Sequence, residues 1–140
     1  MKYLYLFFLL LLVNVAAHAQ SSLGLTMGEL RAKYERSTSA KWEIKKAGNG
    51  QTYVVFEDIT DGTSIASYFS TSPELSEALV TQVRVIGPTE RFFTEFSSKC
   101  DKAYRKLDTG LWAGGDNAFL VTVHSRGPVA VMTFTLLTKE

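Results

Sequence analysis

His124 is the residue of this sequence best suited to acid–base chemistry, because it is the only histidine beyond residue 19. One imidazole titrates near neutral pH but does not make a multi-histidine metal site. In the alternating segment that contains Phe119, Val121 and Val123, His124 has the opposite parity, and Ser125 would point to the other face of a strand. We therefore expect His124 to face solvent and to form no triad with Ser125.

Acidic residues offer a second kind of chemistry, because a pair of carboxylates can catalyse glycoside hydrolysis. Glu57 with Asp58, and Glu74 with Glu77, stand where loops or strand ends are expected. Acidic side chains at such positions are ordinarily solvated, so we interpret them first as surface residues. A small exported hydrolase that uses such a pair or His124 is the alternative function.

A calcium loop is the other hypothesis that acidic residues suggest, at Asp58, Asp61 and Gly62. An EF-hand loop needs oxygen ligands at alternate positions, and Ile59 occupies one of them. A hairpin turn with Asp61 and Gly62 at its tip accounts for the same residues. We expect no metal and no cofactor.

Cys100 and a glycine-rich segment complete the candidates for reactive sites. Cys100 lies on the apolar stripe of an expected helix with no base beside it, which favours a buried structural thiol over a nucleophile; pairing between chains is the alternative. Gly114, Gly115 and Asp116 lack the lysine and the following helix of a phosphate-binding loop. Neither feature predicts an enzyme.

Aromatic residues outside the helical stripes are the best candidates for a binding site. Tryptophan and tyrosine are frequent in interaction hot spots. We select Trp112, which would anchor a partner if it is exposed at its glycine-rich loop, together with Trp42 and Tyr68. The competing interpretation is that most of these aromatic residues belong to the core and that Trp112 closes the end of the sheet over the helix.

Two helices and about six strands are expected to position these residues. Thr26 and Glu29 form a capping box that begins a short amphipathic helix over residues 25–37. A long helix is predicted over residues 90–107, capped by Thr89, because its apolar residues recur at steps of three and four. The apolar positions of this long helix are Phe93, Phe96, Cys100, Ala103 and Leu107.

Alternating segments predict the strands. Strand character is found near residues 41–45, 53–56, 64–70 and 79–86 before the long helix, and near 118–125 and 129–138 after it. Glycines, prolines and aspartates separate these segments, which is typical of hairpins. We predict an α+β fold, in the order helix, four strands, helix and two or three strands, with both helices packed on one face of an antiparallel sheet. The order suggests two similar halves.

The first nineteen residues are typical of a cleavable signal peptide. Lys2 precedes an apolar run, and Ala17 and Ala19 have the small-residue spacing that signal peptidase requires, so we expect cleavage between Ala19 and Gln20. A retained membrane anchor is the alternative, but it needs about 20 apolar residues, and the run is interrupted by Asn14. The short charged region resembles that of bacterial export signals. We predict a periplasmic or secreted location.

Residues 20–140 are then expected to form a single domain without net charge. Of the 15 lysines and arginines only Lys2 is removed, which leaves 14 basic residues against 14 acidic ones. This balance disfavours a nucleic-acid partner, which would require a clustered basic excess. We expect no membrane span after cleavage. The predicted function is non-catalytic binding of a protein, a peptide or a component of the cell envelope, and self-association through a sheet edge is a further alternative.

Overall fold

The computed structural model describes residues 20–36, 40–58, 62–70 and 78–137. The first helix, α2 (Met27–Glu35), begins at the predicted capping box. Thr26 N donates to Glu29 Oε2 at 2.9 Å and Glu29 N donates to Thr26 Oγ1 at 3.3 Å, so two backbone N–H groups at the helix start are satisfied. Leu30 and Tyr34, four residues apart, are the buried residues of this helix.

Four strands follow α2, each antiparallel to the next. They are β1 (Ala40–Lys46), β2 (Thr52–Asp58), β3 (Ser64–Phe69) and β4 (Val80–Gly87). The hairpin between β1 and β2 turns at Gly50, whose φ of 83° lies in the left-handed region. The tip of the next hairpin, including Asp61, lies outside the described residues, as do Glu74 and Glu77.

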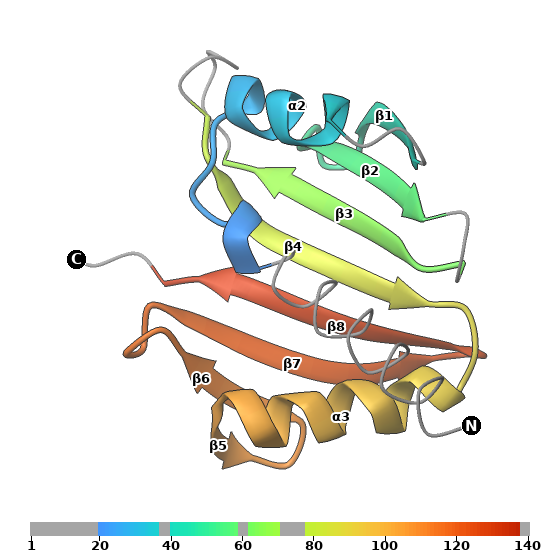
Figure 1. Ribbon diagram of the computed structural model, residues 1–140, viewed down its shortest axis with the longest axis vertical. Helices are drawn as coiled ribbons and strands as arrows, with labels where there is room; N and C mark the ends of the chain where they lie inside the picture. Colours follow the sequence, from blue (N-terminus) through green and yellow to red (C-terminus); the bar gives the residue numbers. More distant parts are fainter. Residues whose placement is uncertain (1–19, 37–39, 59–61, 71–77, 138–140) are drawn as a thin grey trace.

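A second helix and four more strands repeat this arrangement. They are α3 (Arg91–Ala103), β5 (Arg105–Asp108), β6 (Leu111–Gly114), β7 (Phe119–Arg126) and β8 (Val129–Leu136). All eight strands form one antiparallel sheet in the order β1-β2-β3-β4-β8-β7-β6-β5 (Figure 1). Each half is therefore a helix followed by a four-stranded meander, and the last strands of the halves, β4 and β8, pair at the centre of the sheet.

The predicted α+β fold class is wrong, because the protein is mainly sheet, with eight strands, one helix of 13 residues and a few short helical pieces. Two strands were missed. Both β5 and β6 have only four residues, too few for an alternating pattern to emerge. The glycines around β6 indicate a turn when only the sequence is considered, whereas Gly114 lies within the strand.

The long helix is also shorter than the predicted 90–107. Tyr104 takes extended backbone angles (φ −129°, ψ 160°) and its N–H donates to the Cys100 carbonyl, which ends α3 at Ala103. Leu107 continues the helical spacing in the sequence but lies in β5 and is exposed. At the other end the cap position is Glu90 rather than Thr89, and no side chain caps this end of the helix.

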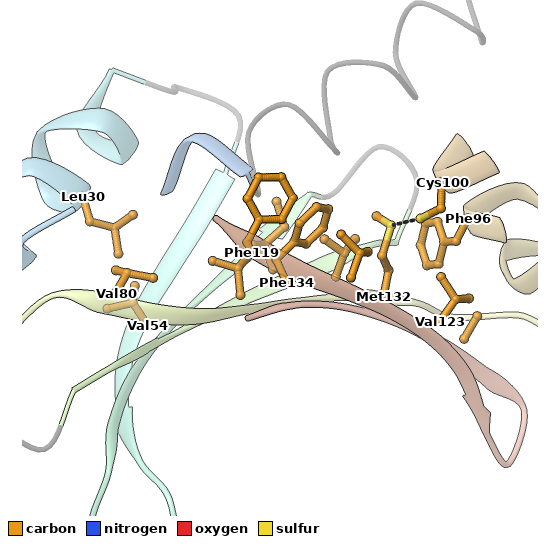
Figure 2. Close-up of a cluster of buried hydrophobic side chains, with 14 of the residues drawn as sticks. Leu30, Val54, Val80, Phe96, Cys100, Phe119, Val123, Met132 and Phe134 are labelled. Atoms are coloured by element: carbon orange, nitrogen blue, oxygen red, sulfur yellow. Dashed lines mark hydrogen bonds between the residues drawn. The ribbon is translucent and has the colours of Figure 1, made fainter. Parts of the chain in front are cut away.

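The hydrophobic core lies between the sheet and the two helices. Figure 2 shows the labelled core side chains on one side of the sheet, the side that carries the helices, while the strands bend away from them. Both halves contribute to this single cluster: Leu30 and Val54 come from the first, and Phe119 and Val123 come from the second. The strand β8, which is central in the sheet, contributes the fully buried Phe134 to this cluster.

The segment before α2 is hydrogen-bonded to the first residue of β4. Gly24 N donates to Val80 O, and Val80 N donates to Leu25 O, both at 2.8 Å. The predicted signal peptide, residues 1–19, lies outside the described residues. No helix within residues 20–36 or 78–137 is long and apolar enough to cross a membrane.

Candidate binding surface

The side of the sheet opposite the core carries no described helix, and we call it the open face. Because side chains alternate along a strand, residues next to core positions point to this face. In β4, for example, Gln82, Arg84 and Ile86 alternate with the fully buried Val83 and Val85. On the other strands, open-face residues include Lys41, Glu43, Lys45, Tyr53, Val55, Glu57, Ala66, Tyr68, Leu120, Thr122, His124, Val131, Thr133 and Thr135.

Side chains of four adjacent strands contact one another on the open face, in a group that we call the tyrosine–arginine cluster. Its members are Tyr53, Tyr68, Gln82, Arg84 and Thr135. The rings of Tyr53 and Tyr68 stack with centroids 5.0 Å apart. The Arg84 guanidinium carbon lies 4.8 Å from the centre of the Tyr68 ring. Arg84 Nε donates to Gln82 Oε1 at 3.1 Å, and Gln82 Nε2 donates to Thr135 Oγ1 at 3.4 Å. The cluster thus connects four adjacent strands.

Strand register explains why these residues meet. Tyr53 is directly opposite Tyr68, and Tyr68 is directly opposite Gln82. Arg84 stands two residues beyond Gln82 on the same face, which places it diagonally across from Tyr68, within reach of a long side chain. Gln82 is in turn opposite Thr135 on β8.

A hollow of about 500 Å³ lies next to this cluster over β1 and β2. Its lining includes the open-face residues Lys41, Glu43, Lys45, Val55 and Glu57, and it also includes Trp42. Val55 provides an apolar floor between Tyr53 and Glu57 of the same strand. Lys45 Nζ lies 3.7 Å from Glu43 Oε2, an exposed ion pair of little energetic weight.

Of the three residues predicted for binding, only Tyr68 belongs to the cluster. Trp112 is 1% exposed, and its Nε1–H donates to Asp101 Oδ1 at 3.0 Å, so the exposure that a partner anchor requires is not met. Trp42 packs against the core on the helix side, where the Arg31 guanidinium carbon lies 5.4 Å from its ring centre. Trp42 also contributes to the lining of the hollow.

The residues considered for catalysis do not come together. His124 is exposed on β7, and Glu57 is exposed on β2. Four strand spacings separate them in the sheet, about 19 Å at the usual spacing. The side chain of Asp58, the partner considered for Glu57, lies outside the described part of the structure. Within the described segments, no group of three or more His, Cys, Asp or Glu residues is placed to hold a metal ion.

Cys100 is fully buried, as expected for a structural thiol. Its Sγ lies 3.8 Å from Met132 Sδ in the core (Figure 2). Burial raises the pKa of this thiol to about 12, and the nearby Asp101 carboxylate adds to the effect. A thiol that stays protonated is a poor nucleophile.

Sequence reasoning missed four residues of the cluster, Tyr53, Gln82, Thr135 and Arg84. The clearest signal in the sequence belongs to Arg84. This arginine interrupts the apolar run of Val83, Val85 and Ile86 as the only charged residue of β4. A charge in a strand that is central in the sheet is the signal that could have identified it.

No protein-family model matches the chain, and no curated protein or solved structure matches it either.

Proposed function

We propose that this protein is a non-catalytic exported domain that binds a protein or peptide segment on the open face of its sheet. The observation that carries the proposal is the tyrosine–arginine cluster beside the hollow over β1 and β2. Tyrosine and arginine are enriched in the residues that dominate binding energy. A cluster whose side chains already hold one another loses less conformational entropy on binding than free side chains would.

The centre of the open face has the composition of an interface core. Ala66, Val131 and Thr133 surround Arg84 with small side chains, and Val55 and Ile86 lie close by. Charged residues stand mainly at the β1 edge, where Lys41 and Glu43 line the hollow. Protein interfaces usually have apolar and aromatic contacts at the centre and charged residues at the rim.

Self-association by adding strands at the sheet edges is disfavoured by the edge strands themselves. The edge strand β1 carries Lys41, Lys45 and Lys46, and the opposite edge strand β5 has four residues that are all exposed. Lysines and very short edge strands both oppose pairing with a second sheet. We expect sedimentation of the mature chain to show a monomer.

Export belongs to the proposal and is tested separately. The signal-peptide pattern of residues 1–19 supports removal of this segment. Expression in a bacterium with fractionation should place the chain outside the cytoplasm, and mass spectrometry should find Gln20 as the first residue. A full-length chain that keeps residue 1 in the cytoplasm would contradict this part of the proposal.

Binding at the open face can be tested with a displayed library of random peptides selected on the mature chain. Selected peptides should lose affinity for a Tyr53→Ser variant, because its ring is part of the cluster. The matched control is Phe93→Ser, which removes an aromatic ring 40% exposed on α3, on the helix side of the sheet. Peptides that bind both variants as well as the parent chain would refute the proposed site.

A further inference from the structure

Arg84 is half-buried at the centre of the open face and has no carboxylate partner among residues 20–36, 40–58, 62–70 and 78–137. An arginine that is removed from water without a counter-charge is uncommon, because burying an unpaired charge costs free energy. Its planar group is held in place by the Tyr68 ring on one side and by Gln82 at Nε. The position of this charge is therefore fixed before any partner arrives.

The remaining N–H groups of Arg84, on its two terminal nitrogens, are the donors available for recognition. The cross-strand neighbours of Arg84 are Ala66 and Thr133, whose small side chains leave room beside the guanidinium. A guanidinium binds a carboxylate through paired, nearly parallel hydrogen bonds, which gives both strength and orientation. The geometry thus suits one carboxylate lying in the plane of the Arg84 group.

The charge of the whole open face favours an acidic partner. Its described cations are Lys41, Lys45, Arg84, Arg105 and Arg126, and its described carboxylates are Glu43, Glu57 and Asp108. Glu43 already lies near Lys45. The excess of positive charge raises the association rate of a negatively charged segment and disfavours a basic one.

We propose that the partner is an acidic protein segment that places one Asp or Glu carboxylate on Arg84, with an adjacent apolar residue against Tyr53 and the Val55 floor of the hollow. This inference rests on the proposed function, since it names the chemistry of the partner that the open face receives. The stacked tyrosines provide the contact area, and Arg84 provides the selectivity for charge.

The test uses the peptides selected on the mature chain, each synthesised with its acidic residues and again with Asn or Gln in their place. Isothermal titration should show the acidic form binding the parent chain about tenfold or more tightly than its amide form, as expected for a hydrogen bond to a charged group. Arg84→Met keeps the aliphatic packing and removes the charge, so on this variant the two forms should bind equally.

The matched control is Arg31→Met, which removes an arginine that also lies over an aromatic ring, Trp42, but on the helix side. It should leave the preference for the acidic form unchanged. Circular dichroism verifies that each variant is folded. If Arg84→Met does not fold, Arg84→Gln takes its place, because it also removes the charge of Arg84 while keeping a polar side chain at this position.

Two results would overturn the inference and spare the proposed function: peptides that bind at Tyr53 but carry no acidic residue, or an acidic preference that persists in Arg84→Met. Inorganic phosphate that competes with the acidic peptides at equal concentration would also overturn it, because the site would then be a phosphate site. Peptides whose affinity is the same for Tyr53→Ser as for the parent chain would instead refute the proposed function itself.

Discussion

Trp112 shows how a single residue connects the second helix to the sheet edge. Its indole ring is buried, while its Nε1–H reaches the partly exposed Asp101 carboxylate on α3 at 3.0 Å. Lys106 on β5 lies 3.8 Å from the same carboxylate and 5.9 Å from the indole ring. These contacts hold α3, β5 and β6 together at a place where the strands are short.

Replacing Trp112 by Phe should therefore lower the free energy of unfolding by about 1–3 kcal/mol, from the lost hydrogen bond and the space left by the smaller ring. Urea denaturation followed by circular dichroism measures the change. The control is Asp101→Asn, which keeps an oxygen acceptor and should cost less. Equal stability of Trp112→Phe and the parent chain would contradict the role given to this contact.

The buried thiol of Cys100 predicts a loss of stability in alkali. Its pKa is about 12 in the folded chain and near 9 when exposed, so the unfolded chain releases this proton first as the pH rises. The stabilisation is complete below about pH 9 and is lost as the pH rises toward about 12. Compared with Cys100→Ala, the parent chain should lose roughly 1–2 kcal/mol more by about pH 10.5.

Urea denaturation of both chains at several pH values tests this difference. The comparison with Cys100→Ala is necessary because Tyr104 also makes stability depend on alkaline pH. Burial also raises the pKa of Tyr104 to about 12, so both chains should lose stability in alkali. Only the difference between them reports on Cys100. Parallel pH profiles for the two chains would show that the thiol does not contribute.

At the scale of the elements, the approach of α3 to β4 depends on Gly87. This glycine ends β4, and a Cβ atom built on it would overlap Cβ and Cγ of Phe92, in the first turn of α3. The absence of a side chain lets the helix fold back over the sheet directly after the strand. Pro88 follows Gly87 and removes a backbone donor from the connection.

Gly87→Ala should therefore destabilise the protein by about 1–3 kcal/mol through overpacking at the start of α3. The matched control is Gly48→Ala, because a Cβ at Gly48 meets no atom within 4 Å and its φ is not positive. Thermal unfolding of both variants measures the contrast. The same loss of stability in both would refute the argument from close packing.

At the scale of the whole molecule, the two halves share one sheet and one core. The pairing of β4 with β8 runs from Gln82 opposite Thr135 to Gly87 opposite Ala130. The first half alone would expose β4 as a sheet edge, and the second half alone would expose β8. Both strands are long and largely apolar, and such edges promote aggregation. The halves are thus similar in architecture but dependent on each other.

We expect the halves to unfold in one cooperative transition. Trp42 lies in the first half and Trp112 in the second, so each tryptophan reports on one half. In variants that keep only one of them, Trp42→Phe and Trp112→Phe, the fluorescence transition in urea should coincide with that of circular dichroism. A fluorescence transition clearly separated from circular dichroism in either variant would mean that the halves unfold separately.

Local signals in the sequence were sufficient for several elements. The capping box at Thr26 and the burial of Cys100 each depend on residues close together in the chain, and the structure confirms both. Helix caps, turns and helical stripes are short-range patterns, so one sequence is enough to reveal them.

Pairing between strands determines the features that local sequence signals did not reveal. The strand register brings Tyr53, Tyr68 and Arg84 together from three strands, and nothing in the local sequence encodes that register. The end of α3 likewise depends on β5 pairing with β6, which overrides a helical spacing that continues to Leu107. The mainly β architecture and the open face are therefore properties of tertiary structure, because hydrogen bonds between distant strands define them.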